Sequence, residues 1–155
     1  MEWITEILTE TWKFIILFLN DKGIDALTIS LINAYANDTH EQIAGRIAEE
    51  ELPGIPISLS SRINPEMQEY ERTITTVANS YVRPKVSTYM SNLKRQLKKK
   101  MNDVQLHVLR SDGGLSSAKA AANYPVNLLM SGPAGGVSGA IWIATQTGFP
   151  NLLTF

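Results

Sequence analysis

The sequence has no cysteine, almost no net charge and no long hydrophobic run. Without cysteine, disulfides and thiol catalysis are excluded, which fits a cytoplasmic protein. A formal net charge of −1 favours neither nucleic acid nor an anionic membrane as a partner. The run at 14–19 is six apolar residues, against about 20 for a membrane span. With two histidines, His40 and His107, we expect no internal metal site.

What is present is typical of an ordinary globular domain: 155 residues, 44% hydrophobic and 19% charged. We therefore predict a single domain over 1–155. Apolar residues at helical spacing predict a helix over 2–20, ended near Gly23. The prediction does not say where the N-terminal helix within 1–23 packs on the rest of the domain. Phe14 and Phe18 fall outside the apolar stripe, so either this helix is buried on two sides or one side meets a partner surface.

The first half then alternates between strand and helix patterns. A β-rich run at 24–33, a helix at 40–51 with Asp38 or Thr39 as N-cap, and a short strand at 55–60 predict a βαβ unit. Another helix is predicted to begin at 64–66, to break or kink at Pro84 and to continue over 85–100. Glu69 and Arg72, three residues apart, favour a local ion pair over a catalytic pair.

The second half predicts strands at 104–109, 126–130 and 152–155, with helices at 116–123 and 133–147 between them. Two groups of small residues flank these helices: Ser111, Asp112, Gly113, Gly114 and Ser131, Gly132, Gly135, Gly136. Glycines between a strand end and a helix start are typical of ligand sites in parallel α/β sheets. The first group is more typical of a tight turn, and the second is also typical of close helix packing without a ligand. Ser131 is a candidate N-cap, with Pro133 in the first turn.

Several stretches resemble the hydantoinase A/5-oxoprolinase family, which includes the large subunits of acetone carboxylases. They are Ser-Gly-Pro-Ala-Gly-Gly-Val-Ser-Gly-Ala at 131–140, Gly-Phe-Pro-Asn-Leu-Leu-Thr-Phe at 148–155, Arg-Ser-Asp-Gly-Gly-Leu-Ser-Ser-Ala at 110–118, Ser-Leu-Ser-Ser at 58–61 and Asn-Ala-Tyr-Ala-Asn-Asp-Thr-His-Glu at 33–41. The last stretch contains His40, a candidate ligand or general base that is also typical of a capping or packing residue. The resemblance implies an α/β fold of βαβ units with a mostly parallel sheet and flanking helices, part of an actin/Hsp70-like (ribonuclease H-like) ATPase lobe.

The resemblance also implies a function. The chain would be a fragment of a large subunit that uses ATP and a divalent metal, Mg or Mn, to carboxylate a ketone with bicarbonate to a β-keto acid. Its partners would be the rest of that subunit, other subunits and a small-molecule substrate. The eight small residues above would lie at the nucleotide cleft or interlobe hinge, and helix 133–147 would connect the lobes.

Both phosphate-binding turns of that fold are missing, so we expect the isolated chain to be inactive and to bind no ATP or metal by itself. No catalytic residue can be assigned. Two alternatives stay open: ATP-dependent ring opening of a hydantoin or 5-oxoproline, and a non-catalytic interaction module.

Overall fold

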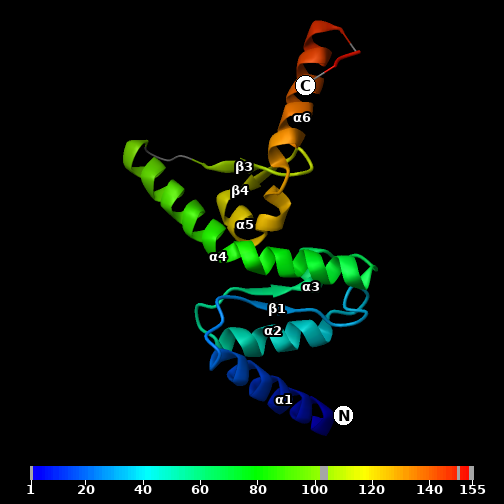
Figure 1. Cartoon of the computed structure of the whole chain (residues 1–155), viewed down its shortest axis with the longest axis vertical. Helices are drawn as coiled ribbons and strands as arrows, with labels where there is room; N and C mark the ends of the chain where they lie inside the picture. The colour runs from blue at the N-terminus through cyan, green and yellow to red at the C-terminus, as the bar shows by residue number, and fades with distance from the viewer. Residues whose placement is uncertain (1, 102–104, 150, 154–155) are drawn as a thin grey trace. The chain divides into compact units, whose positions relative to one another are not determined.

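The computed structural model describes residues 2–101, 105–149 and 151–153. The chain divides into two compact units, Met1–Pro84 and Lys85–Phe155 (Figure 1). Among the described residues, no helix combines the length and the apolar character that crossing a membrane requires.

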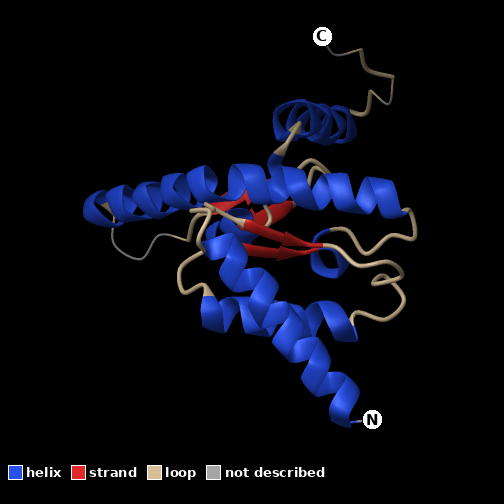
Figure 2. Cartoon of the chain, turned by 60° about the horizontal axis from the view of Figure 1, so that its bottom comes forward, coloured by secondary structure: helices blue, strands red, loops and turns tan. Residues whose placement is uncertain are grey.

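The first unit is a parallel βαβ arrangement with helices on both faces. Its elements are α1 (Glu2–Asn20), β1 (Leu27–Ile29), α2 (Thr39–Glu51), β2 (Ile57–Leu59), α3 (Ser60–Ile63) and the first part of α4 (Glu69–Lys100). Strands β1 and β2 pair in parallel, with Leu27 opposite Ile57. Figures 1 and 2 show α2 on one face of the strands and α4 on the other. The predicted βαβ unit and α/β class are confirmed.

The two faces of this small sheet differ in chemistry, because successive side chains of a strand point to opposite faces. Toward α2 lies an apolar core of Ile16, Ile29, Ala44, Ile47, Ala48, Leu52 and Leu59. Toward α4 the contacts are hydrogen bonds: Thr28 to Ser80 at 2.6 Å and Ser30 to Thr73 at 2.7 Å. A polar layer therefore joins the sheet to α4.

Three local predictions in this unit need correction or refinement. The helix predicted from 64–66 begins at Glu69, because residues 60–63 already form the separate helix α3. Pro84 does not break α4, which continues through it to Lys100, although proline removes one helical hydrogen bond. Phe14 and Phe18 stay exposed, so within the described residues α1 is not buried on two sides.

The second unit contains a hairpin, a short helix, a 3₁₀ turn and a longer helix besides the end of α4. Its further elements are β3 (His107–Leu109), β4 (Leu115–Ser117), α5 (Ala118–Asn123), the 3₁₀ turn η1 (Pro125–Leu128) and α6 (Ser131–Thr147). Strands β3 and β4 pair antiparallel. Met90, Ala121 and Pro125 are among its buried side chains. Met90 is buried in α4, whereas its neighbour Tyr89 is exposed.

Four predicted elements of this unit differ from the structure. The strand predicted at 126–130 is instead the turn η1, which begins at Pro125 and ends at Leu128, and Met130 after it has a left-handed conformation (φ 66°). The helix predicted from residue 116 starts at Ala118, because Leu115–Ser117 pairs with β3 and Ser117 accepts a capping bond from the Ala120 N–H. The strand predicted at 104–109 begins at His107, with residues 102–104 outside the described residues. Of the strand predicted at 152–155, residues 152–153 form no strand, and residues 154–155 lie outside the described residues.

Candidate functional site

The eight predicted site residues lie in the second unit, on the β3–β4 turn and the start of α6. The structure brings the two segments together. The N–H of Ser111 donates to the Asn127 carbonyl at 2.7 Å, and its hydroxyl donates to the same oxygen at 2.8 Å. Gly113 lies so close to α6 that a Cβ there would overlap the Ser138 hydroxyl. The turn and the helix start are therefore one packed region.

Hydrogen bonds within the β3–β4 turn already use most of its N–H groups. Gly113 donates to the Arg110 carbonyl at 3.0 Å, and Gly114 donates to the Asp112 carboxylate at 2.9 Å. Arg110 forms an ion pair with Asp112 at 2.8 Å. An incoming phosphate would have to displace these partners, because phosphate sites in proteins are built from free backbone N–H groups. This geometry supports the tight-turn alternative, and nucleotide binding by these residues stays a prediction.

The start of α6 differs from the prediction in its cap. Met130, not Ser131, is the N-cap residue, and no side chain caps the helix. Pro133 lies in the first turn as predicted, and Gly148 ends the helix in a left-handed conformation (φ 74°). The helix glycines also differ in their surroundings. A Cβ at Gly135 would overlap the Leu109 side chain, whereas one at Gly136 would meet nothing within 4 Å.

This difference gives a matched pair of substitutions. We expect Gly136→Ala to stabilise α6 by up to about 1 kcal/mol, since alanine is the better helix former. Gly135→Ala should destabilise it, because Leu109 must move. Amide hydrogen exchange of α6 in the full chain would measure both effects. Equal effects of the two substitutions would contradict the packing described here.

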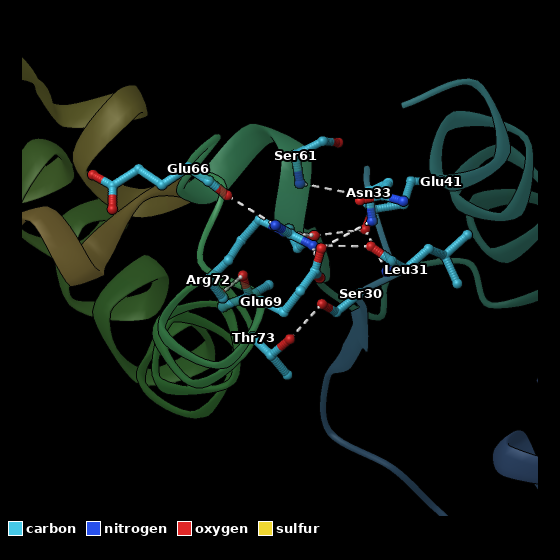
Figure 3. Close-up of polar contacts among 11 residues, drawn as sticks. Ser30, Leu31, Asn33, Glu41, Ser61, Glu66, Glu69, Arg72 and Thr73 are labelled. Carbon is cyan, nitrogen blue, oxygen red and sulfur yellow. Dashed lines mark hydrogen bonds and ion pairs between the residues drawn. The ribbon is translucent and has the colours of Figure 1, made fainter. Parts of the chain in front are cut away.

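A second candidate site lies in the first unit, at the carboxyl ends of β1 and β2. We call it the carboxyl-end cluster: the side chains of Glu41, Ser60, Glu69 and Arg72, with the backbone groups that they bind (Figure 3). Glu41, Ser60 and Arg72 each have an exposed fraction of 0%. Charged residues are almost never this buried without partners, so their hydrogen bonds decide whether the cluster is stable.

Glu41 lies in the first turn of α2 and accepts three hydrogen bonds. The N–H of Leu31, just after β1, donates to Oε1 at 2.8 Å, and the Ser60 hydroxyl donates to the same oxygen at 2.6 Å. The N–H of Ser61, just after β2, donates to Oε2 at 2.9 Å. One carboxylate thus ties together the chain segments that leave the two strands.

Arg72 projects from α4 into the same place. It donates to the Ser60 hydroxyl at 3.1 Å, the Glu66 carbonyl at 2.8 Å and the Leu31 carbonyl at 3.0 Å. Its guanidinium carbon lies 5.6 Å from the centre of the Tyr35 ring, within the range of a cation–π contact. Glu41 and Arg72 share Ser60, and through it they connect α2, α3 and α4.

Glu69 forms the predicted ion pair with Arg72 and also binds the loop after β1. Its second oxygen accepts the N–H of Asn33 at 2.9 Å. Asn33 has a left-handed backbone (φ 59°), which asparagine tolerates better than most residues. The cluster therefore fixes the loop after β1 at both Leu31 and Asn33.

Glu41 and Ser60 belong to this cluster, although neither is predicted from the sequence as a site residue. In the sequence, Glu41 stands out only as the end of the 33–41 stretch and Ser60 only as part of the Ser-Leu-Ser-Ser stretch. A polar residue at the end of each strand of a predicted βαβ unit was the available signal, because parallel strands bring those ends together. His40, which precedes Glu41 in the chain, is exposed, and no described histidine, aspartate or glutamate residues form a group of three or more that could hold a metal ion.

A parallel βαβ unit with flanking helices defines an α/β protein, a class in which ligands commonly bind at the carboxyl ends of the strands. Comparison with known proteins identifies the family within this class. The family model described as hydantoinase/oxoprolinase matches residues 72–155. The chain belongs to the hydantoinase/oxoprolinase family.

Relatives match most of this chain. An uncharacterised protein of Methanocaldococcus jannaschii is 37% identical over 86% of the chain and 20% of its own length. The solved structure of nucleotide-free acetone carboxylase has a TM-score of 0.75 and 26% identity, covering 90% of this chain and 20% of that one. The crystal structure of the ATP-dependent caprolactamase from Pseudomonas jessenii has a TM-score of 0.78 and 26% identity, covering 84% and 19%. The chain spans about a fifth of the length of each of these relatives.

Proposed function

We propose that this chain is part of an ATP-dependent enzyme that activates the carbonyl group of a small molecule. The observation that carries this proposal is the similarity to two solved enzymes, both described as ATP-dependent, whose named substrates are carbonyl compounds. Acetone is a ketone and a caprolactam is a cyclic amide, so activation of a carbonyl carbon or oxygen is the chemistry that the two have in common.

Carboxylation of a ketone is the first specific candidate, because the acetone carboxylase structure matches 90% of the chain. Ring-opening hydrolysis of a cyclic amide is the second, and the similarity to caprolactamase favours it. In either case ATP, with Mg or Mn, would be the cofactor of the intact enzyme, and the rest of the enzyme with its other subunits would be the partners.

Within such an enzyme we assign the chain a positioning role. The described residues do not fit a phosphate site by themselves, since the N–H groups of Ser111, Gly113 and Gly114 already have partners. We therefore derive no chemical step through ATP from them. The carboxyl-end cluster instead holds the loop at 31–38 at the edge of the sheet where α/β proteins bind ligands.

A chimera would test this proposal. The matching stretch of the Methanocaldococcus jannaschii relative would be replaced by this chain, and ATP hydrolysis would be measured with acetone and bicarbonate, with caprolactam and with 5-oxoproline. We expect ATP hydrolysis to rise with one of these substrates. A folded chimera that hydrolyses ATP with none of them, while the unmodified relative responds, would contradict the proposed role.

The same proposal makes a prediction for the isolated chain. Calorimetry with ATP and magnesium should show no saturable binding, because the turn at 111–114 offers too few free N–H groups. Binding in the low micromolar range would overturn the view that this chain contributes positioning and not phosphate contacts.

A further inference from the structure

The outward side of α1 carries large apolar side chains that no described part of the chain covers. Ile16 points inward and is 2% exposed, as part of the apolar core. A helix turns by about 100° per residue, so Phe14 and Phe18 each lie about 160° around the helix from Ile16 and project away from the core. Their exposed fractions are 73% and 53%. In Figure 1 this helix lies at the outside of the first unit, so it has a second apolar side besides the one that it buries.

Charged residues of opposite sign lie at the two ends of this apolar side. Glu10 is four residues before Phe14, and Lys22 is four residues after Phe18. Residues at this spacing are neighbours on one side of a helix. Lys22 follows the end of α1, where its N–H donates to the Leu19 carbonyl at 3.0 Å, and its ammonium nitrogen lies 5.0 Å from the centre of the Phe18 ring. We call the row Glu10, Phe14, Phe18 and Lys22 the outer stripe of α1.

The outer stripe is complementary to itself. When two copies of a helix run antiparallel about a twofold axis, the residue order of one copy faces the reverse order of the other. Phe14 then lies opposite Phe18 of the second copy. With this pairing Glu10 lies opposite Lys22 of the second copy, and the symmetry forms each contact twice. Asp21, the other charged residue at this end, falls opposite an uncharged threonine, so no like charges directly face each other.

We propose that the outer stripe of α1 is an interface with a second copy of this chain. Aromatic rings in contact prefer offset or edge-to-face arrangements, which the interdigitating Phe14 and Phe18 side chains of two helices can adopt. The Lys22 ammonium lies beside Phe18, at the end of the stripe that Glu10 of the second copy would reach. An anionic membrane fits less well, because Glu10 and Asp21 would face its negative headgroups. This pairing does not depend on the reaction that the enzyme catalyses.

Sedimentation equilibrium of the full chain would test the pairing. A single helix contact is smaller than a standard interface of about 1,600 Å², so we expect a dimer with a dissociation constant of roughly 1–100 μM. Phe14→Lys should weaken the dimer about tenfold or more, because it places a charge at the apolar centre of the interface. Asn20→Lys is the matched control. It adds the same charge at an exposed residue of the same helix, outside the outer stripe, and should dimerise as the unmodified chain does.

Exchanging the charges tests both the occupant and its orientation. Glu10→Lys and Lys22→Glu should each weaken the dimer about tenfold at low salt, because each creates two pairs of like charges. Both substitutions in one chain should restore the dimer. A mixture of the two single variants should form a mixed dimer, since one variant then carries a positive charge at both ends of the stripe and the other a negative charge.

Any of three results would overturn the proposal: a chain that stays monomeric far above the expected dissociation constant, a dimer that Phe14→Lys leaves intact, or a double charge variant that dimerises as weakly as the single variants. Binding of the monomeric chain to anionic lipid vesicles, lost in Phe14→Lys, would also overturn it, because a membrane would then be the occupant of the outer stripe.

Discussion

Replacing Arg72 by methionine should destabilise the first unit by about 3–5 kcal/mol, the usual cost of removing one partner from a buried charged group. The side chain is completely buried and donates to Ser60, Glu69 and two backbone carbonyls. Methionine fills much of the same volume but donates no hydrogen bond. The loss is large beside the 5–15 kcal/mol that typically stabilises a domain.

Chemical denaturation followed by tryptophan fluorescence would measure this loss. In a Trp142→Phe background, the remaining tryptophans, Trp3 and Trp12, both lie on α1, so the signal reports the first unit alone. Arg62→Met is the matched control, because Arg62 is exposed and donates a hydrogen bond to the side chain of Gln42. We expect a change within about 0.5 kcal/mol for the control. Equal losses for Arg72→Met and Arg62→Met would show that the cluster does not stabilise the unit.

The contacts of Arg72 show which parts of the candidate site could be predicted from the sequence. Spacing of three along a helix predicted the Glu69–Arg72 pair, and that pair is confirmed. Spacing says nothing about contacts between segments that are far apart in the chain. The bonds from Arg72 to Leu31 and from Ser61 to Glu41 join residues that lie 41 and 20 positions apart. Such contacts depend on how β1, β2 and α4 pack.

The fold could be predicted where local patterns were strong. Alternating strand and helix signals predicted the βαβ unit, and the helix predicted at 133–147 matches α6 to within two residues at its start. The stretch at 126–130 was misassigned because its apolar residues suit a strand, while Pro125 and the left-handed Met130 confine it to a turn. The hairpin was missed because the glycine pair was interpreted as a strand-to-helix turn.

Glu41→Gln should also destabilise the first unit, by about 2–3 kcal/mol. Both carboxylate oxygens of Glu41 accept hydrogen bonds, Oε1 from Leu31 and Ser60 and Oε2 from Ser61. Glutamine keeps the shape but places an NH₂ group where one oxygen was. At least one buried donor then faces another donor, and an unsatisfied buried group costs about 1–3 kcal/mol in addition to the lost charge-assisted bond. The same fluorescence assay applies, with the exposed Glu49→Gln on the same helix as control, expected within about 0.5 kcal/mol.

A double substitution measures the coupling free energy between Glu41 and Arg72. Ser60 donates to Glu41 and accepts from Arg72, so the two charged side chains are coupled through one hydroxyl. If this bridge couples the two charged side chains, Glu41→Gln combined with Arg72→Met should cost less than the sum of the single losses, with a coupling energy of about 0.5–3 kcal/mol. Strictly additive losses would mean that Glu41 and Arg72 stabilise separate parts of the unit. The carboxyl-end cluster would then be two local contacts and could not hold the loop at 31–38 as one structure.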